Sequence, residues 1–196
     1  IQPPERHRAR VARHFDPLPI WYPPFEEAGV DATAYPLHAI TQRPMFMYHA
    51  WGSQNAWLRQ IAARNVLYLH PDTAAAHGLT DGDWAHVDSH SGRITVPVAL
   101  AANVQRDTVW TWNAIGKRRG AWKLDADAPE GRSGFLLNHL ISDILPKREP
   151  NATEYFNADP LTGQAAWFDL RVRLTRAPAQ SQSAPAFPPL PGGEPA

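Results

Sequence analysis

Residues 78–100, GLTDGDWAHVDSHSGRITVPVAL, form the clearest structural pattern in the chain. The Asp-Gly-Asp segment at 81–83 is typical of a turn, and residues 84–89 then alternate between two chemically distinct faces. The HSGR segment turns the chain back through Gly92, and residues 94–98 place β-branched side chains on one side. The pattern predicts an antiparallel β-hairpin with one face turned toward a core.

Short strands dominate the rest of the sequence. We expect strands at 35–41, 65–71, 107–112 and 165–174, and small helices at 52–64, 71–78 and 133–145. Pro97 lacks a backbone N–H, so we expect it at a strand edge or at a bulge. Many short strands with few helices favour a mainly β fold, a β-barrel, over an alternating parallel α/β sheet.

Two of the expected helices carry specific predictions. Ser53 is expected to cap the helix at 52–64, with Trp57, Leu58 and Ile61 on its buried face. Ser133 is expected to cap an amphipathic helix that runs to Leu145. Met45 and Met47, the two methionines of the chain, are interpreted as core residues.

The composition is that of a globular domain with proline-rich ends. The 196 residues contain no cysteine, which excludes disulfides and cysteine-ligated metal sites from this stretch. The 19 basic residues equal the 19 acidic ones, so no net field favours nucleic acid, and no apolar run is long enough to insert directly into a membrane. We expect an extended arm at 1–34, a barrel at 35–176 and a disordered Pro/Ala/Ser-rich tail at 177–196.

The segment TQRPMFMYHAWGSQNAWL, residues 41–58, mixes hydrogen-bonding groups with aromatic and thioether bulk directly after an expected strand. One interpretation is a packed core that contains some polar side chains. The other is a binding site for a flat, polar, partly buried ligand, which needs planar donors, amides and aromatic surfaces together.

In their order along the chain, several motifs resemble the C-terminal domain of molybdopterin oxidoreductases of the dimethyl sulfoxide reductase family. These motifs are the 41–58 segment, LYLHPDTAAAHGLTDGDWAHVDSHSGRITVPV, TWNAIGK, LLNHL and DPLTGQAAWFDLRV. The resemblance spans about residues 35 to 175 and implies a six-stranded double-psi β-barrel, the aspartate-decarboxylase-like fold, with small peripheral helices. The run of Trp, Asn and Lys residues in 111–141 is most similar to the family branch that acts on polysulfide, thiosulfate, tetrathionate or sulfite.

The resemblance also implies a cofactor, molybdenum bis(molybdopterin guanine dinucleotide), and a role in binding it rather than in making bonds. It implies that an iron–sulfur cluster, two further domains and the molybdenum ligand belong to parts of a longer catalytic chain outside these residues. The implied partners are those remaining domains, a membrane anchor subunit, and an iron–sulfur electron-transfer subunit. The compartment, bacterial cytoplasm or periplasm, stays open.

By resemblance, nine residues are candidates for cofactor binding: Thr41, Gln42, Arg43, His49, Trp51, Ser53, Asn113, Asn138 and Gln164. A guanidinium suits a phosphate or a carbonyl edge because its donors are planar and forked. An asparagine among apolar residues, as at position 138, is costly to bury unless its amide is paired.

Four of these candidates also have a purely structural interpretation. Arg43 could form a surface ion pair, and His49 could be a satisfied polar group among aromatics. Asn113 could be a turn residue, and Asn138 could make an internal hydrogen bond.

Two functions from different classes therefore remain open from the sequence. The first is the cofactor-binding part of a molybdenum oxidoreductase, inactive alone, in an enzyme that transfers oxygen or sulfur atoms. The second is a stand-alone double-psi barrel that binds a nucleotide-like ligand or a protein without molybdenum. No protein-ligated metal is expected, because no histidine pair has the helical spacing and carboxylate support of a metal site.

Overall fold

The structure is a computed structural model, and it describes residues 2–21, 23–49, 52, 55–62, 64–113, 115, 135–145, 155–166 and 169–178. Within these ranges it is mainly β. No helix in them is long and apolar enough to cross a lipid bilayer.

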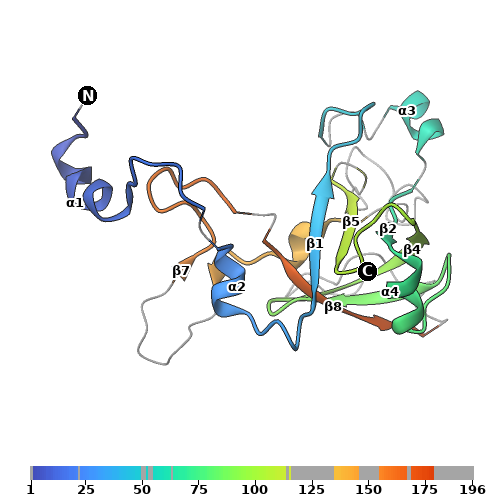
Figure 1. Cartoon of the computed structure of the whole chain (residues 1–196). Helices are drawn as coiled ribbons and strands as arrows, with labels where there is room; N and C mark the ends of the chain where they lie inside the picture. The colour runs from blue at the N-terminus through green and yellow to red at the C-terminus, as the bar shows by residue number, and fades with distance from the viewer. Residues whose placement is uncertain are drawn as a thin grey trace, which may run out of the picture.

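Six strands form a closed barrel in the order β1-β5-β2-β4-β3-β8 (Figure 1). Their bounds are β1 Leu37–Gln42, β2 Leu67–Leu69, β3 Trp84–Asp88, β4 Arg93–Leu100, β5 Thr108–Trp112 and β8 Arg171–Arg176. Two of the pairs, β1 with β5 and β2 with β4, are parallel, and the others are antiparallel. The prediction of a mainly β fold with a six-stranded barrel is confirmed.

The expected hairpin is strands β3 and β4, paired from Trp84 opposite Pro97 to Asp88 opposite Arg93. β4 has a neighbour on each side in the closed barrel, yet Pro97 lies where one side of the strand is unpaired, which agrees with the expected edge position. The N–H of Val98 donates to Asp83 on the β3 side, so the missing N–H of Pro97 lies on the other side. There β2 pairs with β4 only from Val98 onward, so no ladder bond is lost at Pro97.

Alternating residues of the strands fill the barrel. The core includes Ala39, Leu67, Leu69, Ala85, Val87, Ile94, Val96, Val98, Val109, Val172 and Leu174. The period-two pattern of the sequence therefore does identify the inward faces.

The segment after Phe135 differs from the expected helix at 133–145. It forms a short 3-10 helix, η4 Leu137–Leu140, and then strand β6 Ile144–Leu145, which pairs with β7 Tyr155–Phe156. The hydroxyl of Ser142 donates to the carbonyl of Ile144 and accepts from its N–H, and these local bonds compete with a helix. The proposed cap, Ser133, lies outside the described residues.

Helix α3, Ala56–Ile61, is capped by Asn55, whose side chain accepts from the N–H of Trp57, so the prediction of Ser53 as the cap is wrong. Its predicted buried face is also wrong: Trp57 is 76% exposed and Ile61 65%, while Leu58 packs near Met47 in a second small cluster. Met47 is buried as expected, whereas Met45 is fully exposed.

The short helix expected at 71–78 is present as α4, Pro71–Ala76. The side chain of His70 caps it by accepting from the N–H of Asp72, at 3.1 Å. Gly78 follows the helix with φ of 64°, a left-handed conformation that favours glycine.

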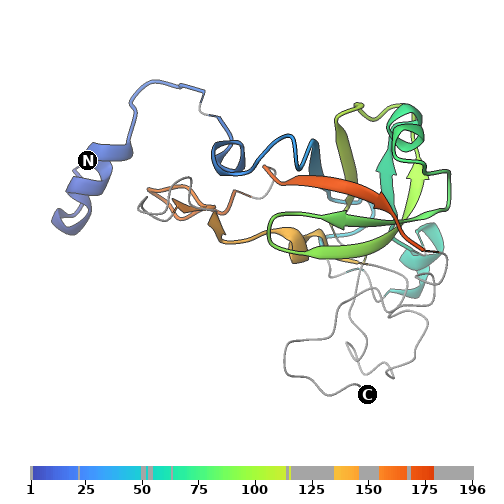
Figure 2. The same cartoon turned by 90° about the horizontal axis from the view of Figure 1, so that it is seen from below.

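The first 34 residues were predicted to be extended. They instead contain two helices, α1 Glu5–His14 and α2 Phe25–Gly29. Their sequences begin with a proline at the cap position and place acidic residues in the first turn, which favours helix starts. α1 buries no residue and projects away from the barrel in both views (Figures 1 and 2). The predicted disorder of the tail falls mostly on residues 179–196, which lie outside the described ranges.

Candidate functional site

The ends of β1 and β5 lie side by side because these strands are parallel. Thr41 pairs with Thr111 and Gln42 with Trp112, and the N–H of Asn113 donates to the carbonyl of Gln42 at 2.9 Å. The structure therefore brings Thr41, Gln42, Arg43 and Asn113, four of the nine candidates, together at one end of the barrel.

Two buried polar atoms at this end have no hydrogen-bond partner among the described residues: Oγ1 of Thr41 and Oδ1 of Asn113. By strand alternation both side chains continue the inward-facing rows of β1 and β5. An unsatisfied buried polar atom costs about 1–3 kcal/mol, and a ligand that hydrogen-bonds both atoms would recover that cost. The pair fits a ligand that offers donors and acceptors along one edge.

Arg43 extends this end with a positive charge. Its side chain is exposed and, within the described part of the chain, makes no ion pair or hydrogen bond. The surface ion pair considered from the sequence is therefore absent there, and the guanidinium is available to a phosphate or a carbonyl edge.

His49 lies further along the same loop. It has a positive φ of 50° and is exposed, with its ring edge-on to Tyr48 at 5.2 Å. It therefore lies against one aromatic ring, and its own ring is accessible. Trp51 and Ser53 lie outside the described residues.

Asn65, which no sequence pattern singled out, organises the end of β5. Its side chain is 1% exposed; Nδ2 donates to the carbonyl of Trp112 at 2.9 Å and to that of Phe135 at 3.4 Å. Its Oδ1 accepts from Thr111 Oγ1 and from the N–H groups of Val66 and Trp112. One buried amide thus joins the start of β2, the end of β5 and the segment before η4.

Asn138 is exposed on η4, between buried Leu137 and Leu140. The expectation of a buried amide is wrong, because the 3-10 turn points its apolar neighbours inward and leaves the amide outside. Phe135, fixed by Asn65, lies three residues before Asn138, and three residues span at most about 11 Å. Asn138 therefore follows closely on a segment that is anchored to the β5 end, and its amide is accessible.

Gln164 lies elsewhere. It is exposed in a turn in which the Asp159 carboxylate accepts from the N–H groups of Leu161 and Thr162. The segment 157–166 projects from the side of the barrel next to α2 and β7 (Figures 1 and 2). The structure does not bring Gln164 to the ends of β1 and β5.

Comparisons with known proteins identify the family of the chain. The family described as "Molydopterin dinucleotide binding domain" matches residues 37–152, more than half of the chain. That range contains the β1 and β5 ends and η4, but not Gln164.

A protein from Allochromatium vinosum that is named as part of a sulfite dehydrogenase is 53% identical over 193 residues, 97% of this chain and 20% of that protein. Trimethylamine-N-oxide reductase of Haemophilus influenzae is 30% identical over 106 residues, 53% of this chain and 12% of that protein. The chain therefore spans 20% or less of the length of these two relatives.

Among solved structures, acetylene hydratase from Pelobacter acetylenicus is similar with a TM-score of 0.60 and 21% identity. The match covers 85% of this chain and 22% of that one. At this identity the likeness concerns the fold alone. Together with the family match over residues 37–152, these findings show that the chain belongs to the molybdopterin dinucleotide-binding domain family.

Proposed function

We propose that this chain is the C-terminal cofactor-binding domain of a longer molybdenum oxidoreductase that oxidises sulfite. The single observation that carries the proposal is the pair of unsatisfied buried atoms, Thr41 Oγ1 and Asn113 Oδ1, beside exposed Arg43. They lie within the matched family range, at the end of the barrel where the parallel strands finish.

The residues present fit one polar edge of a molybdopterin dinucleotide. The hydroxyl of Thr41 and the amide of Asn113 would hydrogen-bond the fused ring, which carries both donors and acceptors. The guanidinium of Arg43 would bind a phosphate or a ring carbonyl, and the amide of Asn138 would approach from η4. Gln164 is left out of this proposed site because its turn lies elsewhere.

When bound, a bis(molybdopterin guanine dinucleotide) molybdenum centre supplies two-electron oxygen-atom transfer, and the chain's own residues only bind and orient it. We place the molybdenum ligand, the iron–sulfur cluster and the electron-transfer and membrane-anchor subunits outside this chain. Sulfite is favoured over other sulfur compounds because the 53% identical relative is named as part of a sulfite dehydrogenase.

Exposed apolar side chains support the assignment to a longer protein. Near the barrel end Met45, Tyr48, Trp57 and Ile61 are 101%, 67%, 76% and 65% exposed. A protein surface that faces solvent rarely exposes so many large apolar residues in one region. We infer that the remaining domains cover them.

A substitution in this region tests that inference. Trp57→Ser is expected to change the free energy of unfolding of the 196-residue chain by less than about 0.5 kcal/mol, because the side chain is exposed there. In the complete enzyme the same change should lower the midpoint of thermal unfolding measurably, because it would truncate a side chain buried against the remaining domains. Equal, small effects in both proteins would contradict coverage of Trp57.

Cofactor content tests the site. In the complete enzyme, Asn113→Ala and Arg43→Ala are each expected to lower molybdenum and pterin per protein by about fivefold, the effect of about 1 kcal/mol. Matched controls are Asn103→Ala and Arg106→Ala, which are exposed at the opposite end of the barrel. Unchanged molybdenum and pterin content in both test variants would reject the site. A wild-type enzyme that carries its full cofactor content but does not oxidise sulfite would reject the substrate.

A further inference from the structure

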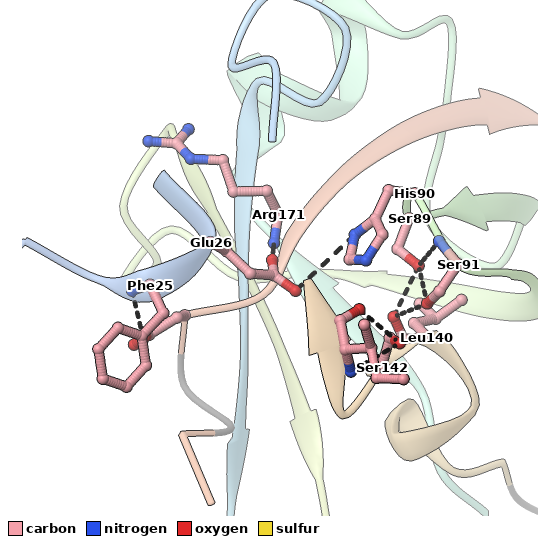
Figure 3. Close-up of polar contacts among 10 residues, drawn as sticks. Phe25, Glu26, Ser89, His90, Ser91, Leu140, Ser142 and Arg171 are labelled. Carbon is pink, nitrogen blue, oxygen red and sulfur yellow. Dashed lines mark hydrogen bonds and ion pairs between the residues drawn. The ribbon is translucent and has the colours of Figure 1, made fainter. Parts of the chain in front are cut away.

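The turn between β3 and β4, residues 89–92, makes an unusual set of contacts with η4. The hydroxyls of Ser89 and Ser91 both donate to the carbonyl of Leu140, at 2.6 and 2.7 Å. Leu140 is the last residue of the 3-10 helix, and carbonyls at a helix end have no partner within the helix. Two hydroxyl donors therefore use both lone pairs of one orphan carbonyl (Figure 3).

Gly92 brings the two backbones into direct contact. A Cβ built at Gly92 would lie 2.8 Å from the carbonyl oxygen of His139, closer than real Cβ atoms approach. The glycine is therefore required by the approach of η4 and not by its own backbone conformation. The turn thus contacts η4 through Ser89, Ser91 and Gly92.

The opposite side of the same turn faces the N-terminal segment. Nδ1 of His90 lies 3.9 Å from Oε1 of Glu26, a fully buried carboxylate on α2 (Figure 3). Oε2 of Glu26 accepts from the backbone N–H of Arg171 at 2.6 Å. α2 is further attached by the N–H of Phe25, which donates to Asp169, and by Glu27, which pairs with the guanidinium of Arg171.

We propose that the turn Ser89–Gly92 is a positioning element for cofactor binding, in which Ser89 and Ser91 fix η4 so that the amide of Asn138 meets the cofactor. The inference rests on the proposed function. The side chain of Asn138 is exposed, and its position is set by the backbone on either side. Phe135 is fixed through Asn65 before it, and Leu140 through the two serines after it.

The turn also connects η4 to α2, because His90 lies between Ser89 and Ser91. Nδ1 of His90 and Oε1 of Glu26 are both buried and have no hydrogen-bond partner among the described residues, so α2 meets this turn by packing at 3.9 Å and not by a hydrogen bond.

The test uses the complete enzyme and the rate at which it releases pterin on dilution. The double variant Ser89→Ala with Ser91→Ala should release pterin about fivefold faster than wild type, the effect of about 1 kcal/mol. Ser89→Thr with Ser91→Thr keeps both hydroxyls and should restore most of the retention. Ser142→Ala is the matched control: its hydroxyl bonds only the local backbone of Ile144, so the rate should not change.

A mutant cycle separates positioning from general stability. If the serines act through Asn138, adding their double variant to Asn138→Ala should accelerate release no further than Asn138→Ala alone. Gly92→Ala, in which the new Cβ displaces the His139 carbonyl, should behave like the serine variant. Additive effects, or no effect of the serine variant, would overturn the inference.

Failure of the inference differs from failure of the proposed function. If Asn113→Ala loses pterin while the serine variant retains it, the cofactor site stands and the positioning role is wrong. If Arg43→Ala, Asn113→Ala and Asn138→Ala all retain pterin, the site and the positioning role are both wrong.

Discussion

Asn65→Ala is expected to lower the free energy of unfolding of the chain by about 3 kcal/mol, a large effect for one side chain. The substitution removes the donors to the carbonyls of Trp112 and Phe135 and the acceptor for Thr111 Oγ1. The amide is 1% exposed, so water does not replace it without structural change. Each buried group left without a partner retains most of its desolvation cost.

Urea unfolding followed by tryptophan fluorescence measures this change. Asn103→Ala is the control, because Asn103 is exposed in a turn at the other end of the barrel and should cost less than about 0.5 kcal/mol. Comparable losses for the two variants would show that Asn65 does not join β5 to the segment before η4. In the complete enzyme Asn65→Ala should also lower pterin content, since it displaces both Asn113 and η4.

The second large effect concerns Glu26 and depends on pH. The pKa of the Glu26 carboxyl is raised from 4.5 to about 7, mainly by burial; the Arg171 N–H opposes this shift, the charge of Asp169 adds to it, and the Arg171 guanidinium opposes it. A raised pKa means that the folded chain retains a proton that the unfolded chain has released. Stability from this group is therefore fully present below pH 4.5 and is lost as the pH rises to about 7.

Glu26→Gln keeps an oxygen for the Arg171 N–H and cannot ionise. The free energy of unfolding of the variant minus that of wild type should be larger at pH 8 than at pH 5, by about 2 kcal/mol. The pKa of His90 is lowered by burial, which gives a slope of the opposite sign at acid pH, but His90 is present in both proteins. Glu27 and His38 lie 3.9 Å apart beside α2 and are also unchanged in the variant.

Urea unfolding at pH 5 and pH 8 gives the difference directly. Glu27→Gln is the matched control: Glu27 is partly exposed and pairs with Arg171, so its effect should be small. A constant difference between Glu26→Gln and wild type at the two pH values would show that Glu26 is ionised in the folded chain. The carboxyl of Glu26 would then not be neutral where α2 packs against the barrel.

Local periodicity was sufficient to predict the hairpin. Ile94, Val96 and Val98 face the core because strand side chains alternate, whatever the remaining strands do. The same pattern reasoning failed for α3, because apolar residues at helical spacing predict a buried face even when no described part of this chain covers it. Trp57 is exposed for that reason.

The site was predictable only in part, and the reasons are physical. Arg43 and Asn113 could be named from their motifs, but their proximity depends on the parallel pairing of β1 with β5, which joins distant segments. Asn65 left no signal, because its partners lie 47 and 70 residues away and any amide before a strand looks alike. The short η4 was mistaken for a longer helix because the strand that pairs with β6 comes later in the chain.

A high-resolution structure of the complete enzyme with its cofactor is the most direct test of the account. We expect Oδ1 of Asn113 and Oγ1 of Thr41 to lie about 2.7–3.2 Å from polar atoms of a pterin ring. If both atoms instead contact only protein or water while the dinucleotide lies along another face of the barrel, the assignment of this site is wrong.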